Sequence, residues 1–317
     1  MTTHRSGEQT IGQAALDAPV VAPSTMDVVK AYVALTKPRI IELLLVTTLP
    51  TMFLAAQGLP KLSVAIVTMV GGMLSAGSAN AFNCILDADI DEKMRRTRRR
   101  PMPRHQVPTS KAYAFAIALA VISTLVLGLG ANWLSAGLAL AANAFYVFVY
   151  TMWLKRRTSQ NIVWGGIAGC FPPLIGWTAV ANNVSWPPLV LFAVVFFWTP
   201  PHTWALAFRY REDYAAADVP MLPVVMDAVG VCRRIFAYSV VTVLVSLLLW
   251  PAAHTGWLYP AAAIIFGAVF IWEAWRLLVR AQAGLRDAEM KPMRLFHWSN
   301  SYLALVFLAA AIDPLIF

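Results

Sequence analysis

The sequence predicts an all-α integral membrane protein with nine transmembrane helices. Three observations lead to this prediction. Hydrophobic residues make up 59% of the chain and charged residues 13%, whereas soluble domains average about 45–50% and about 25%. Long apolar stretches recur along the chain, and basic residues gather in alternate links between them. These features together exclude an ordinary soluble domain.

Each expected span holds close to the roughly 20 apolar residues that cross a bilayer. The nine spans lie near residues 40–58, 62–85, 112–130, 132–153, 162–182, 186–207, 234–253, 257–277 and 296–316. These stretches are too long for the strands of outer-membrane barrels, which need only about 10 residues. Within 112–153 and 162–207 the links between neighbouring spans are so short that the exact span boundaries stay open.

The chain ahead of the first span is polar. Residues 1–25 contain Glu8 and Asp17 and no apolar core region, so we expect a flexible cytoplasmic tail and no cleaved signal peptide. Residues 26–317 form a single transmembrane domain. Residues 26–37 are weakly amphipathic, and they fit either a helix along the membrane interface or a flexible lead-in.

The placement of basic residues predicts the orientation of the chain. One set of alternate links holds most of them, and the other set holds only Lys61. By the positive-inside rule, the basic links and the amino terminus are cytoplasmic, and the carboxyl terminus is outside. The net charge of +9 thus reflects topology in a multi-pass protein of the cell membrane, and it gives no reason to expect nucleic-acid binding. Cys84, Cys170 and Cys232 form no C-x-x-C pair that would indicate a disulfide or zinc site.

A first acidic cluster follows the second span. Asn83, Asp87 and Asp91 are spaced i, i+4, i+8, so on a continuing helix they share one face, and Asp89 points the other way. Three oxygen-bearing side chains suit Mg²⁺. The arginines between 95 and 100 would suit a diphosphate beside that metal. The alternative is a solvated helix end whose acids offset neighbouring bases.

A second acidic cluster follows the sixth span. Asp213 is the expected ligand of a second metal site, with Glu212 and Asp218 nearby. Pro200 and Pro201 should kink or interrupt the sixth span, because they remove backbone donors. His202 follows them within the membrane, where an ionisable residue indicates function. The alternative role for His202 is a hydrogen bond to the freed carbonyls.

At these residues the sequence resembles the UbiA superfamily of membrane prenyltransferases. The mark of that superfamily is N-x-x-x-D-x-x-x-D, matched by Asn83, Asp87 and Asp91. Further segments narrow the resemblance to the branch that farnesylates haem, and the match covers residues 30–315. They are LTKPR (35–39), DIDEKMRRTRRRP (89–101), LKRRTSQNIVWGG (154–166), PPLIGW (172–177), WTPPHTWAL (198–206), DYAAADVPMLPVV (213–225) and RLFHWSNSYLALVFLAAAID (294–313).

The resemblance implies helices around a central cavity that opens to lipid. It also implies Mg²⁺ as cofactor, farnesyl diphosphate as donor and haem B as acceptor, at an active site on the cytoplasmic face. Haem would be a substrate and not a fixed cofactor, and the product would be haem O. Position 217 is Ala, so the second motif of the superfamily carries over only at Asp213, and the number of Mg²⁺ ions stays open. Contacts with haem-biosynthesis or oxidase-assembly proteins and the oligomeric state also stay open.

Roles for individual residues follow from the resemblance. Metal binding and catalysis would fall to Asn83, Asp87, Asp91 and Asp213. Contacts to the diphosphate are expected from Arg39, Arg95, Lys155 and Arg211, with Lys37 as a weaker candidate. Tyr146 and Tyr150 would line the cavity, and an aromatic face would also steady a nearby cation. His202 is the first candidate for a haem ligand or for a residue that supports one.

Three other functions are compatible with part of the sequence. A transporter fits broken helices and an intramembrane His, but the chain shows no repeat relating two halves, and its polar groups gather at one face. A haem chaperone would need His202 and would not need Asp87 or Asp91. A prenyltransferase for another aromatic acceptor is the third alternative.

Overall fold

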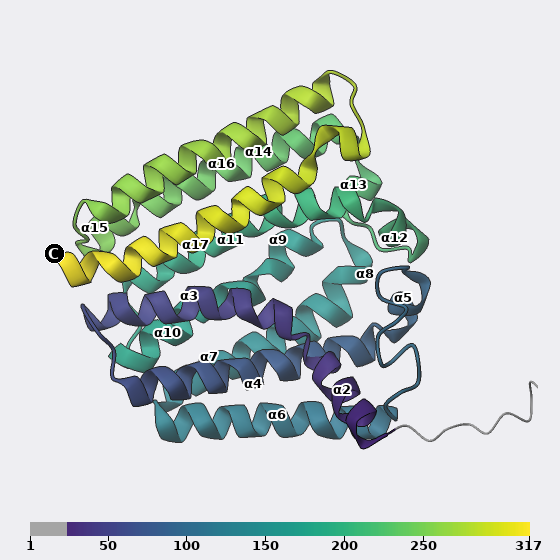
Figure 1. Cartoon of the computed structure of the whole chain (residues 1–317), viewed down its shortest axis with the longest axis horizontal. Helices are drawn as coiled ribbons and strands as arrows, with labels where there is room; N and C mark the ends of the chain where they lie inside the picture. Colours follow the sequence, from purple (N-terminus) through teal and green to yellow (C-terminus); the bar gives the residue numbers. More distant parts are fainter. Residues whose placement is uncertain (1–23) are drawn as a thin grey trace, which may run out of the picture.

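The structure, a computed structural model, describes residues 24–317 apart from the side chains of residues 39–40 and 42–44. This part of the chain is mostly helical and contains no strand. Figure 1 shows long helices lying side by side, with the short helices α5, α12 and α13 at one end and the carboxyl terminus at the other. The described residues therefore form a bundle of membrane-length helices, as the sequence predicts.

The helices follow the order of the expected spans. The long segments are α3 (Pro38–Ala56), α4 (Leu62–Leu86), α6 (Thr109–Gly130), α7 (Trp133–Ala144) with the π-helix η1 (Phe145–Leu154) and α8 (Lys155–Arg157), α9 (Asn161–Gly165) with η2 (Gly166–Cys170) and α10 (Phe171–Ala181), α11 (Trp186–Arg209), α14 (Ala228–Leu247) with α15 (Leu249–Ala253), α16 (Leu258–Gln282) and α17 (Pro292–Ile316). The short helices are α2 (Thr25–Thr36), α5 (Ala88–Lys93), α12 (Arg211–Ala216), α13 (Leu222–Val225) and η3 (Asp287–Met290).

Eight of these segments are long and apolar enough to cross a membrane, counted over the described residues. The helix α3 has 19 residues, but its described apolar part is only Leu45–Ala56. The ninth span therefore stays a prediction. The two span boundaries that the sequence leaves open fall at residues 131–132 and 182–185, where short links separate neighbouring helices.

The amino-terminal helices pack through small residues. A side chain on Gly71 of α4 would collide with Leu127 of α6, so the two helices approach closely there. Ser123 Oγ donates to the carbonyl of Gly71 at 2.7 Å, and Ser78 Oγ donates to that of Ala116 at 2.8 Å. Small residues and hydroxyl bonds are the usual means by which helices associate in lipid, because burial of apolar surface gives little gain there.

The carboxyl-terminal helices α11, α14, α16 and α17 pack around larger side chains. Their shared core buries Trp204, Tyr259, Phe270, Tyr302 and Phe307. The interruption predicted at Pro200 and Pro201 does not occur, because α11 is helical from Trp186 to Arg209. Both prolines are buried, and packing against neighbouring helices keeps a membrane segment helical despite two missing donors.

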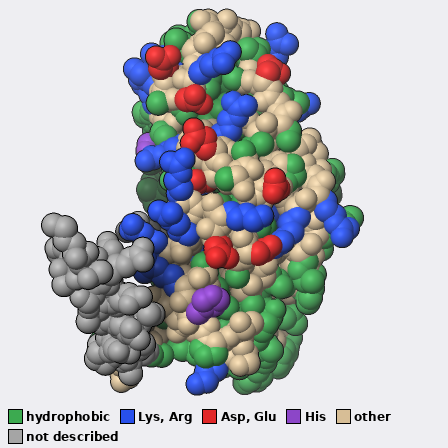
Figure 2. Space-filling model, turned by 90° about the vertical axis from the view of Figure 1, so that its right-hand side faces the viewer, with side chains coloured by type: hydrophobic (Ala, Val, Ile, Leu, Met, Phe, Trp, Pro, Cys, Tyr) green, Lys and Arg blue, Asp and Glu red, His purple; other side chains and the backbone are tan. Residues whose placement is uncertain are grey.

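Charged side chains gather at one end of the bundle. Figure 2 looks at that end and shows Lys, Arg, Asp and Glu spread over it, while the flanks below are largely hydrophobic. Tryptophans mark both ends, as they do at membrane interfaces. Trp133, Trp186 and Trp257 are exposed at the ends of the helices away from the charged face, and Trp153 and Trp164 are exposed close to it. These positions indicate that the helices run from one membrane interface to the other.

Candidate active site

The site is built on the end of α4. Asn83 and Asp87 are 3% and 0% exposed, and Asp91 is 2% exposed on α5. The sequence predicts one continuous helix here, but α4 ends at Leu86 and Asp87 caps it with φ −98°. A bond of 2.8 Å from the Asp91 amide to the Asp87 carbonyl keeps the break within one turn. The two buried carboxylates thus stay on the inner side, and Asp89 points outward.

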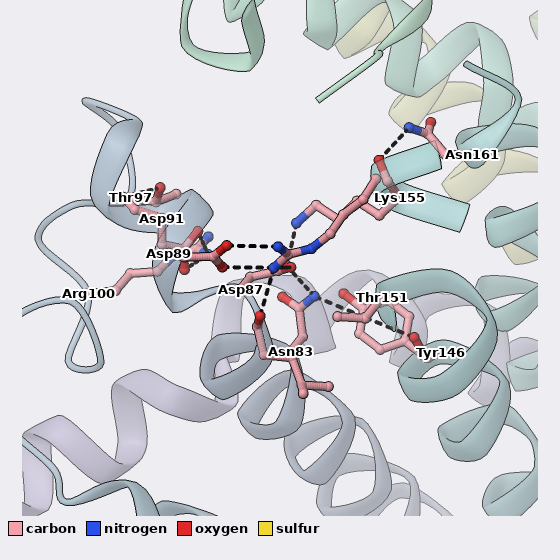
Figure 3. A network of polar contacts seen from close by, with 12 residues as sticks. Asn83, Asp87, Asp89, Asp91, Thr97, Arg100, Tyr146, Thr151, Lys155 and Asn161 are labelled. Carbon is pink, nitrogen blue, oxygen red and sulfur yellow. Dashed lines mark hydrogen bonds and ion pairs between the residues drawn. The ribbon is translucent and has the colours of Figure 1, made fainter. Parts of the chain in front are cut away.

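A basic side chain lies against each polar residue of this motif (Figure 3). Lys37 Nζ donates to Asn83 Oδ1 at 2.6 Å. Lys155 pairs with Asp87, and Arg100 Nη1 donates to both carboxylate oxygens of Asp91 at 2.7 and 2.9 Å. Burial lowers the pKa of Lys37 to about 8. Buried carboxylates without such partners would be strongly destabilising, so these pairs allow the motif to lie inside the protein.

The π-helix η1 brings two further residues to the motif. Asn83 Nδ2 donates to Asp87 Oδ2 at 2.7 Å and to Thr151 Oγ1 at 3.1 Å. Thr151 Oγ1 in turn donates to the carbonyl of Tyr146, five residues earlier, at 2.9 Å. Lys155 follows directly after η1. Short π-helical segments are rare in proteins, but those that exist occur often at functional sites. Here one sets the position of both Thr151 and Lys155.

Arg156 links the motif to Asp89. Its guanidinium donates to both Asp89 oxygens at 2.7 Å and to the carbonyl of Leu86 at 2.9 Å. It also lies 3.8 Å from Asp87. The pairing with Arg156 lowers the pKa of Asp89. Asp89 therefore holds a neighbouring arginine and stands outside the buried set.

The second acidic loop packs against the first. The Arg96 amide donates to Asp213 Oδ2 at 3.3 Å, and Arg95 pairs with Glu212 at 3.3 Å. The Arg96 guanidinium lies 4.9 Å from the centre of the Tyr210 ring. Both loops thus meet at the charged end of the bundle, although the contact of Asp213 is with Arg96 and not with the buried carboxylates.

The donor set of the motif fits Mg²⁺. Its side chains offer oxygens, and the buried Asp87 Oδ1 accepts no hydrogen bond among the described residues. In that part of the chain, no three acidic, His or Cys side chains converge on one point. Mg²⁺ usually binds one or two carboxylates and completes its shell with water and substrate phosphates. Asn83, Asp87 and Asp91 would therefore hold the ion together with oxygens from a substrate.

An apolar cavity of about 200 Å³ lies next to the motif, between α3, α4, η1 and α10. Its few polar lining residues include Asn80, Asn143 and Tyr146. The Tyr146 carbonyl accepts the Thr151 bond, so the cavity and the motif share η1 as a wall. The Tyr150 ring is tilted against the Tyr146 ring with centres 5.3 Å apart and packs against Gly165, and Tyr150 does not line this cavity. The cavity can take an apolar chain whose polar end reaches the motif.

The remaining predicted residues lie elsewhere. The His202 ring is stacked between Trp198 and Phe296 at 4.2 and 4.5 Å, and Nδ1 bonds Ser299 Oγ at 2.9 Å. Its partner is therefore α17 and not a freed carbonyl of α11. Arg211 lines a separate polar pocket beside the start of α14 and the end of α16. The side chain of Arg39 falls outside the described residues.

Sequence reasoning missed Arg156 and Thr151 as parts of the site, and it named Arg100 only within the arginine cluster and not as the partner of Asp91. Arg100 reaches Asp91 through the irregular turns of residues 94–105, which no periodicity predicts. Arg156 is one of the basic residues that the positive-inside rule already explains, so its charge alone does not mark it as part of the site. Thr151 sits one turn before Lys155, and its contact with Asn83 depends on the π-helical register. Only the site geometry separates these residues from their neighbours.

The structure combines membrane-length helices with an apolar cavity and with buried carboxylates beside clustered cations. These features define an integral membrane protein suited to an apolar ligand with an anionic head. The chain belongs to the UbiA prenyltransferase family, which it matches over residues 44–300.

Two curated relatives are closely similar. The chain is 70% identical to "Protoheme IX farnesyltransferase" of Cutibacterium acnes, over 92% of this chain and 87% of that one. It is 61% identical to the protein of the same name from Nocardioides sp., over 92% and 93% of the two chains. This similarity spans nearly the whole length of both relatives, including the candidate site.

Solved structures share the fold at low identity. The chain resembles a digeranylgeranylglyceryl phosphate synthase with a TM-score of 0.74 and 16% identity, over 92% of this chain and all of that one. It resembles a UbiA homologue from Archaeoglobus fulgidus bound to GPP and Mg²⁺ with a TM-score of 0.59 and 14% identity, over 88% and 99% of the chains.

Proposed function

We propose that this protein transfers the farnesyl group of farnesyl diphosphate to a vinyl group of haem B, with addition of water, to give haem O. The observation that carries the proposal is the buried Asn83, Asp87 and Asp91 set beside an apolar cavity, in a chain 70% identical to a protoheme IX farnesyltransferase. The donor set suits the diphosphate end of the substrate, and the cavity suits its apolar chain.

The reaction breaks the allylic C–O bond, and the electron pair leaves with the diphosphate. Mg²⁺, held by Asn83, Asp87 and Asp91 with Asp213 from the second loop, would neutralise charge on that leaving group. Lys155 and Arg100 pair with the motif in the described structure. Both cations lie where they could also donate to diphosphate oxygens, and preorganised cations of this kind lower the barrier.

The vinyl group supplies the electrons for the new carbon–carbon bond. Its π pair attacks the allylic carbon, and the cation left beside the porphyrin takes up water and releases a proton. Tyr146 lines the cavity next to the motif, and its ring face can steady the allylic cation. The largely apolar lining of the cavity would limit access of water to the allylic carbon.

Contact with the diphosphate falls to the basic residues near the motif. Lys37 and Lys155 already contact the motif, and Arg95 lies on the adjoining loop beside Glu212. Arg39 is the second residue of α3, two positions after Lys37, which places its backbone at the same end. Arg211 would need to leave the pocket that it lines, and it is the weakest of the four predicted contacts.

His202 is proposed to help place haem. Trp198 and Phe296 fix its ring, and Ser299 holds Nδ1. Among the described residues Nε2 makes no hydrogen bond, so it is available to a ligand. A porphyrin would have to approach along α11 and α17 to reach it.

The proposed topology has nine spans, with the amino terminus and the active site on the cytoplasmic side. A ninth span is supported by the 19 residues of α3. The side is supported by the basic residues that gather at the end where α5, α8 and α12 meet.

The test uses purified protein in detergent with haem B, farnesyl diphosphate and Mg²⁺. Extracted haem is examined by mass spectrometry for the mass of a farnesyl group plus water, with a chelator control and with Asp87→Asn as the inactive comparison. A metal-dependent adduct in the wild type supports the proposal. Diphosphate release with another acceptor and no haem adduct would replace haem as substrate, and absence of both in folded protein would reject prenyl transfer.

A further inference from the structure

A second charge cluster lies on the flank of the bundle away from α4. Glu273 of α16 is only 3% exposed, and its carboxylate lies 3.0 Å from Arg294 Nε of α17 and 3.8 Å from Arg276 Nη1. Figure 1 shows α16 along the edge of the molecule opposite α6, with α17 beside it. This cluster is therefore separate from the candidate active site.

The cluster has more positive than negative charge. Arg280 follows Arg276 by one turn, so the two share a face of α16. It donates to the carbonyl of Met290 at 3.2 Å and pairs with no carboxylate among the described residues. Five basic and three acidic residues fall between positions 273 and 294. Arg276 and Arg294 keep 36% and 47% of their side chains exposed, so an outside anion can reach them.

An apolar strip runs from these arginines along the same face of α16. Ile265, Trp272 and Val279 are 60%, 53% and 40% exposed, and their spacing of seven keeps them in line with Arg276. Trp275 stands beside Trp272 with ring centres 5.0 Å apart. Exposed tryptophans next to arginines are typical of the headgroup level of a membrane.

We infer that the charged end of α16 and α17 is a binding site for an anionic phospholipid. Arg276, Arg280 and Arg294 take the headgroup phosphate through charge-assisted bonds, and an acyl chain lies along Ile265 and Trp272. A zwitterionic lipid would leave the surplus charge unmatched. A free phosphate ion would use the arginines and leave the apolar strip uncovered, so a lipid fits both halves of the site.

The test measures lipid binding to delipidated, purified protein by native mass spectrometry. Phosphatidylglycerol and phosphatidylcholine with the same acyl chains are titrated separately. Arg280→Gln should weaken phosphatidylglycerol binding about fivefold, which corresponds to about 1 kcal/mol per basic residue near the surface. Glu273→Gln removes the internal counter-charge and should strengthen it by a similar factor. The matched control is Arg233→Gln, an exposed arginine of α14, which should leave affinity unchanged.

The opposite signs of the two variants separate lipid binding from a purely structural ion pair. Equal affinity of the wild type for the two lipids would overturn the inference. So would a loss of phosphatidylglycerol affinity in Glu273→Gln protein that stays monodisperse, or full displacement of the lipid by millimolar inorganic phosphate. Arg280 pairs with no acid, so Arg280→Gln remains a valid test if Glu273→Gln does not fold.

Discussion

At the scale of single residues, the candidate site is a set of matched charges. Lys37, Lys155 and Arg100 each hold one member of the motif. Asp87 Oδ1 accepts no hydrogen bond among the described residues, so it is open to a metal. A diphosphate beside the motif would offer Lys155 and Arg100 additional anionic partners.

The first prediction compares three aspartates within five residues. Asp87→Asn and Asp91→Asn each remove a buried charge that would bind Mg²⁺, so turnover should fall on the order of 10²-fold or more. Asp89→Asn loses only an exposed pair with Arg156 and should retain turnover within a factor of a few. The measurement is the initial rate of haem O formation at saturating Mg²⁺. Equal losses at Asp87 and Asp89 would show that the buried face is not the metal site.

The second prediction concerns the buried pair itself. Lys155→Met leaves Asp87, which is 0% exposed, without its closest cation, and losing one partner of a buried pair costs about 3–5 kcal/mol. The unfolding temperature in detergent should therefore drop. Adding Asp87→Asn should restore most of it, because no unpaired charge remains, while turnover stays absent. If the double variant were less stable than either single one, the pair would not be the source of the loss.

Part of this site could be predicted from the sequence, because helical spacing places Asn83, Asp87 and Asp91 on one side. The partners of the motif could not be predicted in the same way. Lys37 lies between α2 and α3 in the left-handed conformation, with φ 52°, and its side chain reaches Asn83. Arg100 reaches Asp91 across an irregular loop. Such contacts depend on the turns of the chain and leave no periodic pattern.

At the scale of elements, η1 has the clearest consequence for the site. The hydropathy of residues 132–153 predicts a span but not its π-helical register, which aligns Thr151 with Asn83. Residues that orient metal ligands typically change metal affinity about 10- to 100-fold when lost. The third prediction is that Thr151→Val raises the Mg²⁺ concentration for half-maximal rate by about that factor and changes the maximal rate less.

The matched control for that prediction is Thr124→Val. Thr124 makes a similar bond to the carbonyl of Ala120, at 2.9 Å, on the remote helix α6. It should leave the Mg²⁺ dependence unchanged. A rise in Mg²⁺ requirement in both variants would indicate a general effect of losing a helix hydroxyl, and no rise in either would remove Thr151 from the support of the motif.

The short helix α2 decides between the two interpretations of residues 26–37. It is a capped helix whose inner residues Ala31 and Leu35 are buried, while Met26, Val29 and Val33 are 60%, 52% and 51% exposed. An outward apolar face at the charged end of a membrane bundle fits the bilayer interface. Residues 35–37 also contact Cys84, Asn80 and Asn83 of α4, so α2 ties that interface to the site.

The fourth prediction follows from that face. A nitroxide on Val29→Cys should be accessible to oxygen in the lipid, and one on Ala34→Cys, on the other side of α2, should be accessible to a water-soluble nickel complex. Cys84, Cys170 and Cys232 are buried, so labelling is confined to the new cysteine. Equal accessibility of both positions to the nickel complex would mean that α2 lies in water.

At the scale of the whole molecule, hydropathy predicted the order and approximate bounds of the eight spans that the described residues confirm, and the ninth span stays a prediction. Hydropathy works because a membrane segment must satisfy its backbone bonds internally, so length and apolarity are enough to identify a helix. Which helices become neighbours is a different matter. Side-chain shape decides how α17 packs against both α11 and α3 and where the cavity beside η1 forms. The hydropathy of a single span does not reveal either feature.

The last prediction tests the orientation of the bundle. The charged end carries the candidate site, and the positive-inside rule places it in the cytoplasm, where its basic loops need not be carried across the bilayer. The exposed positions Val184, in the link between α10 and α11, and Ala215, on α12, lie at opposite ends of α11. In intact cells stripped of their wall, a membrane-impermeant maleimide should label Val184→Cys and spare Ala215→Cys until the membrane is opened. Labelling of Ala215→Cys in intact cells would reverse the topology and place the motif on the outer side of the membrane.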